Sequence, residues 1–175
     1  MLSRRQFLRL SAACTASALI PALPEFSHAQ ETRESRAIFD EGLNWMNPKS
    51  ANSVCQRIKR AGFNVFMPCV WHGRGTVWPS ELAPWDSNNT HTPGYDPLEN
   101  LLEIAREYDI EIHPWITVGL RQRHFLAEYV DSPTSESFDW HNPAFRNFAV
   151  SLIMEVVNRY PIHGINLDFV RFASP

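Results

Sequence analysis

The stretch that decides the fold reads Gly164-Ile165-Asn166-Leu167-Asp168-Phe169-Val170-Arg171-Phe172. Side chains alternate between the two faces of a strand, so Asn166 and Asp168 share one face and Ile165, Leu167 and Phe169 lie on the other. A strand buried on both faces is nearly all apolar, so packing gives no reason for an acid near its end. Since α/β folds build their sites at the carboxyl ends of strands, Asp168 is the first candidate catalytic residue. The alternative is a buried Asp168 that pairs with Arg171 and ties down a loop.

Segments typical of strands and helices alternate upstream of this stretch. The spacing of apolar residues predicts strands over 38–45, 63–71, 110–118 and from Gly164, and helices over 54–61, 97–108 and 143–160. This order predicts a parallel sheet with right-handed crossovers. The long segments that follow the second and third strands favour a (β/α)₈ TIM barrel, whose sites are built from such loops. The alternative, an open doubly wound sheet, usually has a Gly-rich first turn, which this sequence lacks.

The third expected strand has one aliphatic and one polar face. The aliphatic face consists of Ile110, Ile112, Ile116 and Val118, and the polar face of Glu111, His113, Trp115 and Thr117. In a barrel the aliphatic face meets the helices, so the polar face points inward. His113 is therefore a candidate ligand-binding residue, or else a core histidine that is hydrogen-bonded to Asp168 or to a backbone carbonyl.

The loop over 72–95 and the segment after it carry two further motifs. They are the aromatic-x-Ser-x-x-x-Pro-Trp run from Trp78 to Trp85 and the run Tyr95-Asp96-Pro97-Leu98. On physical grounds the second run also starts a helix, because Asp caps it and Pro takes its first position. Together with the Gly-x-x-x-Asp spacing of Gly164 and Asp168, these ordered points resemble the family-10-like glycosyl hydrolase domains, which are distantly similar to the α-amylase superfamily.

The resemblance covers nearly all of residues 38–175 and implies a TIM barrel of which about the first four β/α units are present. It implies that Asp168 is the nucleophile and that its acid partner comes from a strand beyond Pro175, in the remaining half of the barrel. The α-amylase-type pattern usually has Arg two residues before the Asp, where this chain has Asn166. The carboxylates to consider within the chain are Glu41, Glu81, Glu111 and Asp86, and none is favoured.

The positions of the tryptophans are a second indication of a ligand-binding site. The six tryptophans are Trp45, Trp71, Trp78, Trp85, Trp115 and Trp140, and all fall near strand ends or in the loops beyond them. Flat aromatic faces suit sugar rings, and the indole N–H adds a donor. Trp71, Trp78 and Trp115 are therefore candidate substrate-binding residues, together with Arg171. For each single tryptophan, packing in the core is the alternative.

The first residues predict export. Arg4-Arg5 lies in Ser3-Arg4-Arg5-Gln6-Phe7-Leu8, which resembles a twin-arginine signal, and a weakly apolar segment and a small-x-small site at 27–29 follow. We expect a signal peptide over 1–29, recognition by the twin-arginine export machinery, and a domain over 30–175 in the periplasm or outside the cell. The alternative is an uncleaved membrane anchor.

Composition excludes several classes of partner. The sixteen basic and nineteen acidic residues become thirteen and eighteen once Arg4, Arg5, Arg9 and Glu25 are removed, a net charge of −5 that argues against nucleic acid. No metal-binding or nucleophile-elbow motif is present, so no metal or cofactor is expected. Cys55 and Cys69 are either paired or simply buried.

These observations predict an exported glycoside hydrolase-like protein that acts on a polysaccharide or a cell-envelope glycan. Hydrolysis of a glycosidic bond needs two carboxylates, and Asp168 is the one that the sequence singles out. A non-catalytic carbohydrate-binding barrel is the alternative, and a barrel enzyme of different chemistry is a third possibility. The sugar and the linkage do not follow from the sequence.

Overall fold

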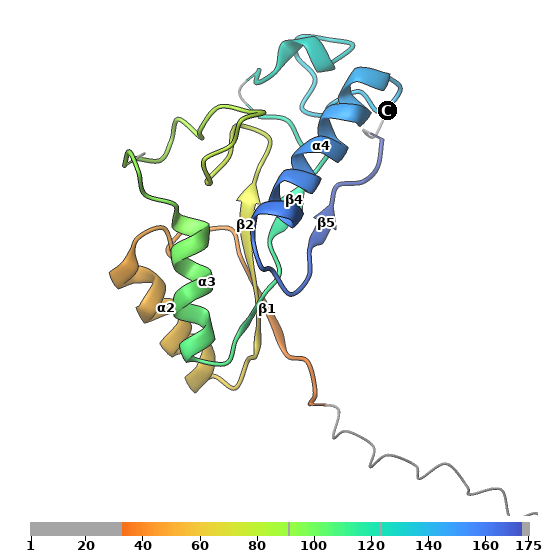
Figure 1. The fold of residues 1–175 in the computed structure, drawn as a ribbon. Helices are drawn as coiled ribbons and strands as arrows, with labels where there is room; N and C mark the ends of the chain where they lie inside the picture. Colours follow the sequence, from red (N-terminus) through yellow and green to blue (C-terminus); the bar gives the residue numbers. More distant parts are fainter. Residues whose placement is uncertain (1–32, 91, 123, 173–175) are drawn as a thin grey trace, which may run out of the picture. The chain divides into compact units, whose positions relative to one another are not determined.

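Figure 1 shows the computed structural model, which describes residues 33–90, 92–122 and 124–172. The chain from Ser35 onward forms one compact unit. The signal peptide predicted over 1–29 lies outside the described residues. No helix in the described ranges is long and apolar enough to cross a membrane.

The secondary structure follows the predicted alternation (Figure 1). In chain order the elements are β1 (Ala37–Asp40), α2 (Pro48–Arg60), β2 (Val65–Trp71), α3 (Pro97–Glu107), β3 (Glu111–Ile112), β4 (Trp115–Thr117), a 3-10 turn (Ala127–Tyr129), α4 (Pro143–Arg159) and β5 (Asn166–Asp168). The first strand ends at Asp40 instead of Trp45. It ends there because the backbone N–H of Gly42 donates to the Asp40 carboxylate and Leu43 takes a left-handed φ of 54°, which turns the chain.

All strand pairs are parallel, and the strand order is β1-β2-β4-β5, with β3 beside β2. Neighbours in the sheet thus follow the order of the chain, as in a barrel, whereas a doubly wound sheet reverses its order partway. The strand predicted over 110–118 is split at Pro114, which has no N–H for the ladder. The pairing survives around it, because His113 N donates to Phe66 O and Asn166 N donates to Pro114 O.

Each helix starts with a side-chain cap followed by proline. Asn47 caps α2 and forms a capping box with Ser50, Asp96 accepts from the N–H groups of Leu98 and Glu99 at the start of α3, and Asn142 caps α4. These caps satisfy amide groups that would otherwise lack partners, and proline is tolerated at the first helical position. The start predicted for α3 is confirmed.

The hydrophobic core lies between the helices and the aliphatic face of the sheet. It includes Val54 and Ile58 of α2, Leu98, Leu101 and Leu102 of α3, Phe145, Leu152 and Val156 of α4, and Ile110, Ile112 and Ile116 of the third predicted strand. Cys55 and Cys69 are both buried and free, so the two do not form a disulfide. The opposite face of the sheet is partly open, since Phe39 is 52% exposed and Trp115 and Asp168 are half-buried.

Candidate active site

Asp168 lies at the carboxyl end of β5, on the open face of the sheet, in register with Thr117 of β4. Both of its carboxylate oxygens accept a hydrogen bond. The backbone N–H of Phe169 donates to Oδ1 at 2.7 Å, and the indole N–H of Trp115 donates to Oδ2 at 3.2 Å. Two fixed donors orient the carboxylate as a hydrogen-bond acceptor at the end of the strand.

The backbone directly after Asp168 is strained. Phe169 has a φ of 53°, a left-handed conformation that is rare for a bulky side chain. Gly119 holds it there, because the Gly119 N–H donates to Phe169 O at 3.2 Å and a β-carbon at Gly119 would come within 2.5 Å of that oxygen. Strained residues of this kind cluster at functional sites, and this one directs its N–H onto the Asp168 carboxylate.

Trp115 is the centre of an aromatic group on the open face. The ring of Phe39 meets the indole edge-on at a centroid distance of 5.3 Å, and the ring of His72 does so at 6.5 Å. Phe39 comes from β1, His72 directly follows β2, and Trp115 lies in β4. Neighbouring strands thus provide a half-exposed indole beside an oriented carboxylate.

The two long loops at this end of the sheet are locked to each other. The Arg74 guanidinium binds Asp86 at 2.8 Å and Gln122 at 2.9 Å, so it bridges the loop after β2 and the loop after β4. Gly73 makes the approach possible, because it has a φ of 70° and a β-carbon there would lie 2.0 Å from Leu120 O. The loops form a fixed wall beside the strand ends.

Arg121 organises the second loop from within. It is 2% exposed, and its guanidinium donates to the carbonyl oxygens of Phe125, Pro133 and Ser135 at 2.7, 3.0 and 2.8 Å. A buried cation that binds only carbonyl oxygens fixes backbone segments that are distant in sequence. No local sequence pattern predicts this role of Arg121, apart from the length of the loop.

Arg171 does not pair with Asp168. Its guanidinium lies over the Phe169 ring at 5.0 Å, and no ion pair joins it to Asp168 in the described part of the chain. Together with Ser135, Glu136 and Ser137, it lines a polar pocket beside the strained turn. The structure therefore lacks the ion pair on which the purely structural interpretation of Asp168 rested, and it places Arg171 next to the candidate site.

Trp71 is not on the open face. It is 1% exposed and packs against Phe125 and Phe148 at 5.7 and 5.9 Å. An irregularity between Cys69 and Trp71 shifts the register, so that Cys69 pairs with Trp115 but Trp71 pairs with Ile116 of the core face. A bulge of this kind reverses the face on which later residues lie. We therefore assign Trp71 to the core and not to substrate binding.

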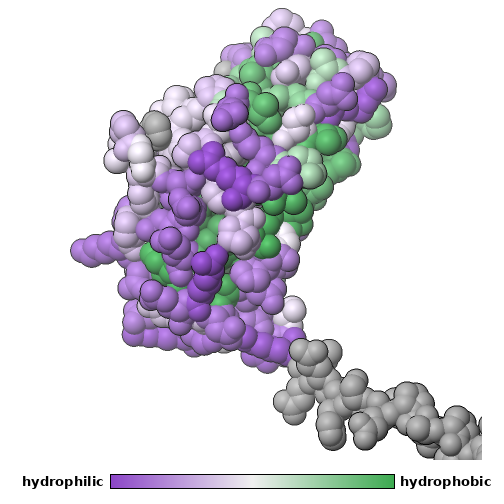
Figure 2. Space-filling model, in the orientation of Figure 1, coloured by the Kyte–Doolittle hydropathy of each residue, from purple (hydrophilic) through white to green (hydrophobic). Residues whose placement is uncertain are grey.

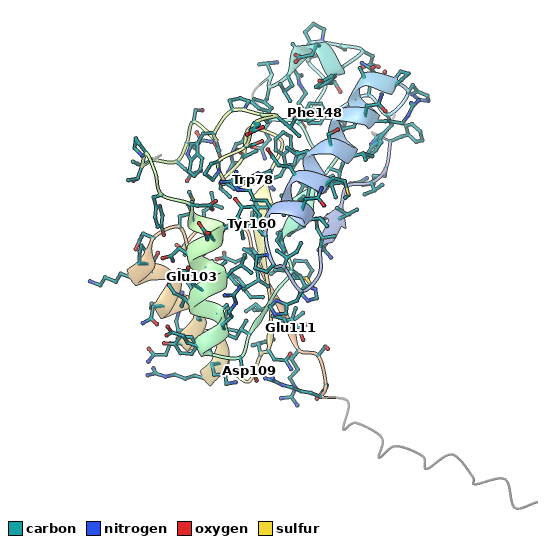
Figure 3. All side chains as sticks on the ribbon, viewed as in Figure 1. Trp78, Glu103, Asp109, Glu111, Phe148 and Tyr160 are labelled. Atoms are coloured by element: carbon teal, nitrogen blue, oxygen red, sulfur yellow. The ribbon has the colours of Figure 1, made fainter. Side chains whose placement is uncertain are left out.

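Trp78 is also a structural residue. It is fully buried, and its indole N–H donates to Glu155 of α4 at 3.0 Å. The same carboxylate accepts from the Ser80 hydroxyl at 2.6 Å and from the Glu81 N–H at 2.8 Å. Figure 3 shows Trp78 between α3 and α4, near Tyr160, whose hydroxyl binds the α3 cap Asp96 at 2.6 Å. The sequence motifs that begin at Trp78 and Tyr95 thus fasten the first loop to α4.

Glu155→Gln is expected to lower the free energy of unfolding by about 1–3 kcal/mol, because the carboxamide has one accepting oxygen for three donors and lacks the charge that strengthens these hydrogen bonds. Chemical denaturation followed by far-UV circular dichroism measures this change. Glu103→Gln, at an exposed site on α3, is the matched control and should leave stability unchanged. Equal stability of the two variants would contradict the anchoring role.

His113 and Glu111 lie at the other end of the sheet. They bind each other at 3.1 Å, and His113 packs against Gly164, where a β-carbon would come within 2.6 Å of its ring. His113 is four residues from Thr117, roughly 13 Å along a strand. Figure 3 places Glu111 near Asp109 and far from Phe148. We therefore exclude both residues from the site that contains Asp168.

The other carboxylates considered in the sequence differ in position. Asp86 is 2% exposed and is paired with Arg74, and Glu81 lies on an exposed part of the first loop. Glu41 directly follows β1 and binds His72 at 2.8 Å. Glu41 is thus the carboxylate of this set that contacts the aromatic group around Trp115. Among the described residues, no cluster of three His, Cys, Asp or Glu side chains could hold a metal ion.

The chain is similar in sequence to a known family of glycosyl hydrolase-like domains. Residues 38–173 match the family described as Glycosyl hydrolase-like 10. The chain belongs to this family. Residues 1–21 match the signal sequence of the twin-arginine translocation pathway, which indicates export across the membrane and confirms the predicted use of that machinery.

Two curated relatives are named as glycosyl hydrolases. Glycosyl hydrolase DigH of Escherichia coli K12 is 26% identical over 72% of this chain and 37% of its own length. Glycosyl hydrolase YngK of Bacillus subtilis is 24% identical over 94% of this chain and 38% of its own length. The matched part of the chain thus spans little more than a third of the length of these relatives.

Solved structures confirm the fold class. The α-fucosidase of Thermotoga maritima matches with a TM-score of 0.52 at 17% identity, over 68% of this chain and 28% of that one. A hypothetical protein of Ruminiclostridium thermocellum matches with a TM-score of 0.59 at 11% identity, over 80% and 78% of the two chains. The fold is an α/β fold with a parallel sheet that corresponds to part of a TIM-barrel glycosidase.

Proposed function

We propose that this exported protein hydrolyses glycosidic bonds in a polysaccharide or cell-envelope glycan, with Asp168 as the nucleophile and Trp115 as the platform for a sugar ring. The observation that carries the proposal is the hydrogen bond from the Trp115 indole to Asp168 on the open face of the sheet. An indole that is half-exposed and also holds the carboxylate places the sugar and the attacking oxygen side by side. Membership in a glycosyl hydrolase-like family supports this chemistry.

In the proposed mechanism, Asp168 attacks the anomeric carbon as the bond to the leaving oxygen breaks, and a carboxylic acid protonates that oxygen. Water then hydrolyses the glycosyl ester, and configuration is retained. Arg171 and Glu136 line the pocket beside the strained turn and are available for groups on the glycan. The acid partner belongs to a further β/α unit, so the remaining half of the barrel is part of the proposal.

Binding is tested with Trp115→Ala and Trp115→Phe against cellotetraose, chitotetraose, maltotetraose and cell-wall glycan strands, by isothermal titration calorimetry. Trp115→Ala should lower the affinity for the bound glycan about tenfold or more, since a stacked aromatic face contributes on the order of 1–2 kcal/mol. Trp115→Phe keeps a flat face but removes the donor to Asp168, so it should retain most of the affinity and lose turnover.

The two variants also separate hydrolysis from binding alone. If the protein is a non-catalytic glycan-binding barrel, the wild type binds a glycan but releases no aryl group from an activated aryl glycoside, and Trp115→Phe is then indistinguishable from it. Unchanged affinity in Trp115→Ala, for a glycan that the wild type binds, would contradict the platform.

A further inference from the structure

A second polar group borders the Trp115 platform, on the side of β1 and β2. Glu41 directly follows β1 and His72 directly follows β2, and these strands are parallel neighbours whose ends meet at the same edge of the sheet. His72 Nε2 lies 2.8 Å from Glu41 Oε1. Phe39 of β1, two residues before Glu41, contacts Trp115 with its ring, and the ring of His72 does so as well.

The contact with Glu41 indicates which nitrogen of His72 carries a proton. An ionised carboxylate only accepts hydrogen bonds, so Nε2 carries the proton and donates to Glu41. His72 Nδ1 lies 3.5 Å from Cys69 Sγ. Burial raises the pKa of the Cys69 thiol to about 12, so the thiol keeps its proton, which lies within reach of both Trp71 O, at 3.6 Å, and His72 Nδ1. Burial also lowers the pKa of His72, which favours the neutral ring that this arrangement requires.

Both nitrogens of His72 are therefore engaged by the protein. Its imidazole cannot bind a glycan hydroxyl without giving up one of these contacts, so its role is to position Glu41. The Glu41 side chain is 62% exposed, and among the described contacts only Oε1 is used. A carboxylate whose orientation is fixed at one oxygen and whose other oxygen is open is a ready acceptor for the hydroxyl groups of a sugar.

We propose that Glu41 is a hydroxyl-binding, specificity-determining carboxylate of the glycan site, and that His72 is the residue that positions it. Glu41 lies on the β1 side of the Trp115 indole and Asp168 on the β5 side, so a sugar ring over the indole meets one carboxylate at its reacting carbon and the other at its hydroxyls. The ligand class is a neutral glycan with free hydroxyl groups. The proposal rests on the proposed function.

The experiment measures the affinity of the full chain for the tetrasaccharide that it binds most tightly among cellotetraose, chitotetraose and maltotetraose, and for monodeoxy analogues of that sugar. Glu41→Gln should lower affinity about tenfold or more, because an amide replaces a charged acceptor. One deoxy analogue should bind the wild type more weakly than its parent, and this difference should disappear in Glu41→Gln. A merely structural role would leave the difference in place.

Two variants of His72 test the positioning role. His72→Phe keeps the ring but removes the donor, so it should reproduce the loss of affinity seen in Glu41→Gln. His72→Gln can present an amide N–H where Nε2 lies and should recover most of the affinity. Melting temperatures are measured in parallel, so that a loss of affinity in His72→Phe counts only where the protein remains folded.

The chain offers a matched control in its second Glu–His pair, Glu111 and His113, which lies at the opposite end of the sheet. Glu111→Gln should leave the affinity unchanged. If Glu41→Gln binds like the wild type while Trp115→Ala does not, this inference is overturned and the proposed function stands. If the wild type binds none of the three tetrasaccharides, this inference is overturned, and if it also fails to bind cell-wall glycan strands, the proposed function is overturned with it.

Discussion

Asp168→Asn should lower the rate of glycoside hydrolysis roughly 10⁴-fold, the scale of loss that follows removal of one member of a catalytic unit. The substitution keeps the shape but removes the negative charge that attacks the anomeric carbon. Aryl glycosides with a good leaving group are the appropriate substrates, because their departure needs little help from an acid. The rate is measured from release of the aryl group.

The fold and glycan affinity should survive the substitution. The asparagine amide can accept from only one of the two donors, Phe169 N–H and Trp115 Nε1, so we expect a stability loss of about 1–2 kcal/mol. Asp168→Ala in the presence of azide is the control, since the small anion can replace the missing nucleophile and restore part of the turnover. Unchanged hydrolysis in Asp168→Asn would exclude Asp168 from the chemistry.

Helix α4 and strand β5 carry an exposed apolar surface. Val150, Met154 and Val157 lie at helical spacing on α4 and are 60, 42 and 40% exposed, and Leu167 of β5 is 44% exposed. Figure 2 shows hydrophobic residues gathered over α4. Among the described strands, β5 pairs only with β4 and β1 only with β2, so each presents an unpaired edge. In a complete barrel, the next β/α unit would cover α4 and the edge of β5, and the last strand would pair with β1.

Residues 30–175 alone should therefore associate, with most of the chain in dimers or larger species at about 10 μM, because unpaired edges and exposed apolar faces promote association. Sedimentation velocity measures the fractions of monomer, dimer and larger species. The double variant Val150→Lys and Met154→Lys should shift the chain towards monomer, and Gln56→Lys, at an exposed site on α2, should not. A monomeric wild type with a sharp cooperative melt would contradict the expectation that a further half of the barrel covers this surface.

The alternation of strands and helices was predictable because it depends on local spacing, and the place of Asp168 on the open face follows from the period of two within one strand. Trp71 shows where that period fails. The register shift between Cys69 and Trp71 moves Trp71 to the core face, and although Pro68 marks an irregularity nearby, a sequence does not say on which side a bulge falls.

Contacts between residues that are distant in sequence explain the other differences between the predicted and the observed site. Trp78 is fixed by Glu155 and Glu41 by His72, contacts that exist only once the sheet and its helices have assembled. Arg121 binds carbonyl oxygens of its own loop, and carbonyls carry no sequence signature. The sequence predicts that some of the tryptophans lie beside Asp168. Which tryptophan does so depends on the register of the whole sheet, which the sequence does not determine.

The most direct measurement of the central claim is covalent trapping of the nucleophile. The protein is incubated with 2-deoxy-2-fluoro glycosyl fluorides of several sugars, whose activated leaving group makes the acid partner dispensable, and the labelled peptide is located by mass spectrometry. We expect one glycosyl adduct on Asp168 that is absent from Asp168→Asn. An adduct on another residue, or hydrolysis of the matching aryl glycoside without any adduct, would contradict the assignment of Asp168 as the nucleophile.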